Sequence, residues 1–185
     1  MSYTFNNCLN YNCDDLPDYD QTLDNCGAKG RLGGASVLYL IECDATINDP
    51  GSQTDLDTAV TNGDAYLIDN VKIGFGQPSP IEVDSTTSCG TKQVANYNRE
   101  FSLEDYKVTA GNTEFWSTAK KRVYGGAVLV ECTTDGLDAV VTFINAQITI
   151  ESYRDFPNTN EQLQKYVVTG KWKSYDDPLQ ITYTP

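Results

Sequence analysis

Two neighbouring apolar segments constrain the fold of this 185-residue chain more than any other feature. Residues 127–132 and 139–151 are rich in Val and Ile, and the turn residues Thr134, Asp135 and Gly136 lie between them. β-Branched side chains favour strands, and an Asp-Gly pair between two apolar runs is typical of a β-hairpin. The second segment also alternates apolar and polar side chains over most of its length, which predicts one long strand with a single apolar face.

Similar segments elsewhere in the chain predict a mainly β protein. Strand-like runs lie at residues 35–43, 65–73, 81–83, 98–108, 166–175 and 179–183. Two short helices are expected, at residues 54–60 with Thr54 as the N-cap and at residues 113–121 with Thr113 as the N-cap. We therefore expect a β-sandwich or barrel over residues 32–185, preceded by an irregular acidic arm at residues 1–31.

The N-terminal arm contains few residues that could build a core. Its larger apolar side chains are isolated from one another, and they are Phe5, Leu9, Leu16 and Leu23. The arm also carries a run of acidic residues, which are Asp14, Asp15, Asp18, Asp20 and Asp24. This segment lacks the Gly and the distal Glu of an EF-hand calcium loop. We expect the acidic run to be a solvated face and the apolar residues to contact a neighbouring subunit.

The charge balance disfavours several classes of function. The chain has 13 Lys and Arg against 26 Asp and Glu, a formal charge of −13, so a nucleic-acid binder with a basic patch is not expected. The only basic run is Lys120-Lys121-Arg122, which falls at a predicted helix end and would balance the helix dipole or meet an acidic neighbour. Neither a membrane-spanning stretch nor a secretory signal is recognisable.

The sequence contains no histidine, which is the commonest general base and a frequent metal ligand. We therefore expect neither an enzyme nor a cofactor. The carboxylate pairs Glu104 with Asp105 and Asp135 with Asp138 do not establish the separation that a hydrolytic cleft requires. The residues Gly74-Phe75-Gly76 lack the following Gly-Lys-Ser of a phosphate-binding loop, so they predict a turn.

Six cysteines are present without any Cys-x-x-Cys pair, and they are Cys8, Cys13, Cys26, Cys43, Cys89 and Cys132. Such spacing does not match a zinc site, which usually uses closely spaced cysteine pairs. Our interpretation is that Cys43 and Cys132 are small buried strand residues and that the others are free thiols. A metal site in the arm and a framework of disulfides are the alternatives.

The order of several short motifs resembles a known group of proteins. The motifs are Cys26-Gly27-Ala28-Lys29-Gly30, Gly33-Gly34, Cys89-Gly90-Thr91-Lys92, Asn98-Arg99-Glu100-Phe101, Trp172 and Pro178-Leu179. With them the chain resembles virion structural proteins of tailed phages infecting Bacteroidetes, in particular the head-to-tail ring and tail-tube-like subunits of crAss-like phages. The resemblance implies a tail-tube-like β-sandwich or barrel with a flanking helix, assembled into a ring, and it brings no catalytic residues.

The function implied by the resemblance is that of a non-enzymatic, ring-forming subunit of the tail or head–tail connector. Such a homo-oligomer would contact portal, ring, tube or tail subunits in a virion assembled in the bacterial cytoplasm, with no membrane partner. DNA would pass through its channel without specific binding, because acidic groups on the lumen repel phosphate. Acidic residues in turns are the candidates for such a lining, and they are Asp44, Asp49, Asp84 and Asp135.

Two other roles are compatible with an acidic, Tyr-rich β-domain. One is a secreted or surface-exposed carbohydrate-binding β-sandwich, in which disulfides would be natural. The other is a capsid decoration protein. A count of free thiols is expected to separate a subunit assembled inside the cell from a secreted module.

Overall fold

The computed structural model describes residues 2–4, 35–84, 92–131, 140–156 and 164–184. Its helices are α1 (Gln53–Asn62) and α2 (Ala110–Ala119). Its strands are β1 (Tyr3–Thr4), β2 (Ala35–Ile41), β3 (Thr46–Ile47), β4 (Ala65–Phe75), β5 (Ser79–Asp84), β6 (Lys92–Asp105), β7 (Val123–Tyr124), β8 (Gly126–Glu131), β9 (Val140–Ile144), β10 (Ile148–Asp155), β11 (Lys165–Lys173) and β12 (Leu179–Thr182). The predicted mainly β fold with two short helices is confirmed.

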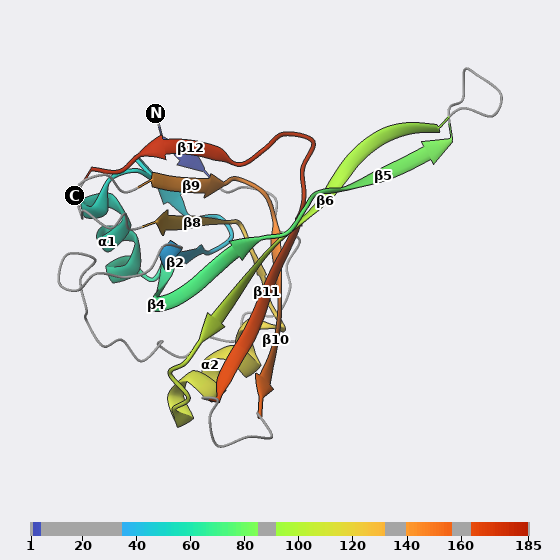
Figure 1. Ribbon diagram of the computed structural model, residues 1–185. Helices are drawn as coiled ribbons and strands as arrows, with labels where there is room; N and C mark the ends of the chain where they lie inside the picture. The colour runs from blue at the N-terminus through green and yellow to red at the C-terminus, as the bar shows by residue number, and fades with distance from the viewer. Residues whose placement is uncertain (1, 5–34, 85–91, 132–139, 157–163, 185) are drawn as a thin grey trace.

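The strands form one large antiparallel sheet and one small one (Figure 1). The large sheet has the order β12-β9-β8-β2-β4-β6-β11-β10-β7, and β5 pairs with β6 beside this path. The small sheet joins β1 to β3. Within the described strands the terminal ones, β12 and β7, do not pair with each other, so the arrangement is consistent with a β-sandwich and not with a closed barrel.

Apolar side chains are buried on both faces of the central strands. In β2, Leu38 and Leu40 enter a larger core cluster, whereas Tyr39 and Ile41 enter a smaller one on the opposite face. Helix α2 completes the larger cluster and α1 completes the smaller one. A strand covered on both faces needs apolar residues at every position, which explains why the run in β2 is continuous rather than alternating.

Both helices begin before the predicted residue. The N-cap of α1 is Ser52, whose hydroxyl accepts a hydrogen bond from the N–H of the third residue after it at 3.4 Å. The N-cap of α2 is Thr109, with the equivalent bond at 3.1 Å. The predicted caps Thr54 and Thr113 were wrong, because both lie inside the first helical turn. Each helix has more than one Ser or Thr near its beginning, and only the backbone geometry shows which of them is the N-cap.

The single long strand predicted at residues 139–151 was wrong. The chain leaves the sheet after Ile144 and re-enters it at Ile148, forming β9 and β10. Strand β9 pairs with β8 in antiparallel register, as the predicted hairpin requires, whereas β10 pairs with β7 and β11 at the far end of the sheet. The alternation of side chains continues across the break, so the pattern alone could not reveal it.

The beginning of the chain forms a strand that the sequence did not predict. Tyr3 and Thr4 pair with β3, and the ring of Tyr3 meets Phe143 edge-on with the ring centres 4.9 Å apart. Two residues are too few to show a period, so the pattern gave no signal. The remaining arm, including the predicted contact residues, lies outside the described residues: Phe5, Leu9, Leu16 and Leu23.

Cys43 corrects the interpretation of the cysteines. It lies in the turn after β2 rather than in the strand, it is half-buried, and it is disulfide-bonded. Its sulfur lies 3.2 Å from the carbonyl oxygen of Val123. The interpretation of Cys43 as a buried, reduced strand residue was therefore wrong, while Cys132 and the other four cysteines lie outside the described residues.

Candidate functional site: a projecting hairpin and the cleft at its base

Strands β5 and β6 form a hairpin that projects from the body of the protein (Figure 1). The second half of β6 is held between β4 and β11, but residues 92–98 pair with β5. A bulge between Ile81 and Glu82 shifts the register within the hairpin. Bulges increase local twist and bend a strand, so this one helps to direct the hairpin.

The hairpin is exposed on both faces. Val83 on β5 is 46% exposed and Val94 on β6 is 41% exposed. The register places Val94 opposite Glu82 and Lys92 opposite Asp84, so these four side chains share one face. Isolated two-stranded hairpins are marginally stable in water. A hairpin that carries exposed valines is therefore suited to covering by another surface.

A cleft of about 690 Å³ lies at the base of the hairpin, where the β4–β5 link, the middle of β6 and the β11–β12 connection meet. Its apolar lining consists of Phe75, Pro78, Trp172, Pro178 and Leu179. Phe75 is 44% exposed and Leu179 is 51% exposed, whereas Trp172 is nearly buried and meets Phe75 edge-on with the ring centres 6.5 Å apart. The apolar surface of the cleft is thus largely open to solvent.

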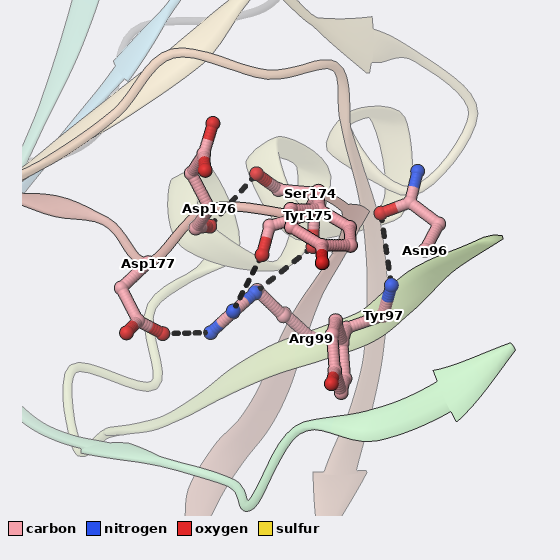
Figure 2. A network of polar contacts seen from close by, with 7 residues as sticks. All are labelled: Asn96, Tyr97, Arg99, Ser174, Tyr175, Asp176 and Asp177. Atoms are coloured by element: carbon pink, nitrogen blue, oxygen red, sulfur yellow. Dashed lines mark hydrogen bonds and ion pairs between the residues drawn. The ribbon is translucent and has the colours of Figure 1, made fainter. Parts of the chain in front are cut away.

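Arg99 fixes the wall of this cleft that is formed by the β11–β12 connection (Figure 2). Its Nε donates to the carbonyl oxygen of Ser174 at 3.2 Å, and its Nη2 donates to that of Tyr175 at 3.4 Å. Its Nη1 pairs with Asp177 at 2.6 Å. The guanidinium also lies 5.6 Å from the ring centre of Tyr97. Arg99 is only 8% exposed, so these contacts compensate a buried charge, and they also stabilise the tight turn of the β11–β12 connection.

The cleft carries an excess of negative charge. Among the described residues that line it, Glu100, Glu131 and Asp177 are acidic, and Arg99, which pairs with Asp177, is the only cation. Within the described part of the chain, the side chains of Glu100 and Glu131 make no ion pair or hydrogen bond. A cleft with an apolar lining and uncompensated carboxylates is suited to a cationic group on an apolar stem.

The predicted channel-lining carboxylates are not gathered on one surface of the subunit. Asp44 and Asp49 are exposed residues flanking β3 in the body, and the side chain of Asp49 accepts a hydrogen bond from the N–H of Gly51 at 2.9 Å. Asp84 ends β5 on the hairpin, and Asp135 lies outside the described residues. A common lining would therefore require contributions from several subunits.

The cleft itself was not predicted, although its residues carried a signal. Arg99, Glu100, Trp172, Pro178 and Leu179 belong to separate motifs that the family resemblance singled out, and the fold brings them together. The register pairs Arg99 of β6 directly with Trp172 of β11. The sequence shows neither that pairing nor which face each strand turns to solvent, so the motifs could not be combined in advance.

Two carboxylates considered as a pair point to opposite faces of β6, because consecutive strand residues alternate. Asp105 is fully buried and accepts a hydrogen bond from the indole N–H of Trp116 at 2.8 Å. Glu104 pairs on the outer face with Lys165, and hydrogen bonds from Lys165 and Tyr106 lower the pKa of Glu104 below its ordinary value. These two carboxylates therefore do not share a substrate position.

A second polar cluster surrounds Arg122, the last residue of the basic run. Arg122 pairs with Glu42 at 2.8 Å, which confirms the expected acidic neighbour. Arg122 also donates to the hydroxyl of Tyr66 at 3.3 Å. Burial is the main cause that raises the pKa of Tyr66 to about 12. These contacts join the chain after α2 to the end of β2, so we interpret the cluster as structural.

The described residues contain no group of three or more His, Cys, Asp and Glu side chains placed to hold a metal ion. Among the helices of that same part of the chain, none has both the length and the apolar character of a membrane span. No protein-family model, no curated protein and no solved structure matches the chain. The hairpin and its cleft are therefore interpreted from their own geometry and chemistry.

Proposed function

We propose that this protein is a non-enzymatic structural subunit that assembles into a homo-oligomeric ring of a phage virion, within the tail or the head–tail connector. The ring would contribute to the channel through which DNA passes without specific binding. Its partners would be further copies of the chain and adjoining portal, ring, tube or tail subunits. The proposal combines the motif resemblance with the geometry of the β5–β6 hairpin.

The projecting hairpin is the observation that carries the proposal. It contributes little to the core, and both of its faces are exposed with a valine on each strand. Unpaired strand edges and exposed apolar side chains favour association with another chain. In a closed ring every such edge and patch is covered, because each subunit both offers and receives the same contact.

The charge of the chain supports the channel part of the proposal. A formal charge of −13 gives a repulsive potential toward phosphate, and a narrow lumen with low-dielectric walls concentrates that potential. Repulsion would keep DNA from adhering to the wall. The exposed carboxylates of several subunits, including Asp44, Asp49 and Asp84, would together provide the lining.

Electron microscopy of the purified full chain, combined with native mass spectrometry, tests the proposal. We expect rings of one subunit number, and we expect the double variant V83D/V94D to remain folded and monomeric. Tyr153→Asp provides the control, since Tyr153 is 62% exposed on β10, away from the hairpin. A wild-type protein that stays monomeric at all concentrations, or a double variant that still forms rings, would contradict the proposal.

A secreted or surface carbohydrate-binding module is the second candidate, and the disulfide of Cys43 favours it. Disulfides are typical of secreted proteins but also persist on virion surfaces, so a count of free thiols alone does not separate the two functions. Exposed aromatic side chains such as Tyr175 and Phe156 would then be sugar-stacking platforms. Titration with oligosaccharides, followed by Tyr and Trp fluorescence, would detect such binding in the monomer.

A further inference from the structure

The cleft at the base of the hairpin lies at the end of the sheet where β2 begins. Ala35, the first residue of β2, stands opposite Ile73 of β4 on one side and opposite Glu131 of β8 on the other. Both neighbouring strands lead into the cleft lining, since Phe75 lies two residues beyond Ile73 on β4 and Glu131 itself lines the cleft. The segment that precedes β2 in the sequence is bonded to Ala35, so it joins the described fold beside the cleft.

The cleft presents a carboxylate and an aromatic surface on one side of the sheet. Directly opposed strand residues share a face, so Glu131 and Ile73 point to the same side as Ala35, and Phe75 follows two residues later on that side. The ring of Phe75 is 44% exposed, and Glu131 is half-buried without an ion-pair partner within the described part of the chain. An arginine suits such a surface, because its guanidinium pairs with carboxylates and stacks on aromatic rings.

The sequence directly before β2 contains such a group. Residues 27–34 include Lys29 and Arg31, which are the only Lys or Arg among residues 1–71, and they include no acidic residue. Arg31 precedes Ala35 by four residues, so the two Cα atoms are at most about 14 Å apart even along a fully extended chain. Two of the three residues between them are glycines, which adopt backbone conformations closed to other residues and so allow the chain to bend toward the cleft.

We infer that residues 29–32 occupy the cleft of their own copy, with the guanidinium of Arg31 beside Glu131 and its stem against Phe75 and Trp172. The charges are complementary, because the segment is cationic and Arg99 offsets only Asp177 in the cleft. The short tether favours the same copy over a neighbour, since it gives the segment a high effective concentration at the cleft. The inference goes beyond the proposed function, because the contact forms within a single copy whether or not the copies assemble.

Proteolysis of the full chain tests the contact, because trypsin cleaves after Arg31. The reference site is Lys121, an exposed residue in the turn after α2. We expect Glu131→Gln to accelerate cleavage after Arg31 about tenfold, as for the loss of one charge contact, and to leave cleavage after Lys121 unchanged. Fragments are quantified by mass spectrometry after quenching under reducing conditions, so that disulfide-linked peptides separate. Glu114→Gln is the matched control, since Glu114 is exposed on α2, and it should change neither rate.

The salt dependence of the same assay separates an ion pair from a general effect on packing. In the wild-type protein, the rate of cleavage after Arg31 relative to that after Lys121 should rise with salt, because exposed charges are screened. In Glu131→Gln this ratio should be independent of salt. Rates that do not respond to Glu131→Gln, or that rise equally at both sites, would overturn the inference.

Photo-crosslinking tests the position of the segment directly. Benzoylphenylalanine replaces Gln180, an exposed residue of β12 that lines the cleft. Copies labelled with ¹⁴N and ¹⁵N are mixed before irradiation, so that links within one copy and links between copies differ in mass. We expect links to residues 29–34 of the same copy. Links to that segment of a different copy, or links only to other residues, would overturn the inference, and neither result decides whether rings form.

Discussion

Replacing Gly170 by alanine should destabilise the protein through one specific contact. Gly170 faces Phe101 across the β11–β6 pair, and a Cβ at position 170 would lie 2.2 Å from Cζ and 2.3 Å from Cε1 of the phenyl ring. Carbon atoms in contact are ordinarily separated by about 3.5–4.0 Å, so the ring would have to move by more than 1 Å, roughly the difference between the two distances. The ring has little room, because Phe101 is fully buried beside Trp172.

The expected cost follows from overpacking. Forcing extra volume into a packed core costs about 1–3 kcal/mol, and the conformational advantage of Ala over Gly offsets about 0.5–1 kcal/mol of that cost. We therefore expect Gly170→Ala to lower the free energy of unfolding by about 1–2 kcal/mol. Urea denaturation would show this change as a lower transition midpoint with an unchanged slope.

The chain provides a matched control for this substitution. Gly74 lies inside β4, and a Cβ there would have its nearest neighbour, the hydroxyl oxygen of Ser102, at 4.0 Å. Gly74→Ala should therefore change the free energy of unfolding by less than about 0.5 kcal/mol. In the double variant G170A/F101L the smaller side chain should relieve part of the cost, so the two effects should not add. Equal stability of Gly170→Ala and Gly74→Ala, or strict additivity with Phe101→Leu, would refute this reasoning.

Three further predictions concern charged side chains. Arg99→Met should lower the free energy of unfolding by about 1–3 kcal/mol in urea denaturation, because the turn between β11 and β12 loses its charged donors. Glu104 has its pKa lowered by Lys165, so it contributes stability that is fully present above its ordinary pKa of 4.5 and is lost as the pH falls through its lower folded pKa. Glu104→Gln should reduce the loss of stability on acidification below pH 4.5, measured as the urea midpoint against pH. If the ring lines a DNA channel, replacing the exposed carboxylates Asp44, Asp49 and Asp84 by Lys should leave rings intact and slow DNA ejection. The effect should be strongest at low salt, where screening is weakest.

Local patterns predicted the secondary structure better than they predicted the site. The strands β2, β4, β8 and β11 were recognisable because their apolar side chains are contiguous or alternate over short distances. The break between β9 and β10 was not, because the chain changes its partner strands there without changing its pattern. The strand predicted at residues 98–108 begins earlier, at Lys92, and this part of β6 was missed for a related reason, since its exposed residues show no apolar period.

The cleft depends on long-range pairing, which no local pattern contains. Arg99 meets Trp172 only because β6 and β11 pair in one particular register, and a slip of one strand by one residue would place the two side chains on opposite faces of the sheet. The acidic turn residues were easier to notice, yet their function depends on how several copies are arranged. Electrostatic predictions from sequence therefore named exposed carboxylates, whereas the structure identified those that stand beside an apolar surface.

The packing of Gly170 also bears on the cleft. Trp172 lies two residues further along the same face of β11, with its ring centre 6.1 Å from that of Phe101, and it forms part of the cleft lining. A displaced Phe101 ring would therefore disturb Trp172, and with it the lining of the cleft. If subunits of the proposed ring contact one another at this cleft, a preformed cleft lowers the ordering cost of association, and loosening it should weaken association without removing any contact residue. Gly170→Ala should then reduce both stability and subunit association, whereas Gly74→Ala should leave both unchanged. A Gly170→Ala protein that is less stable but associates normally would show that the subunits do not contact one another at the cleft.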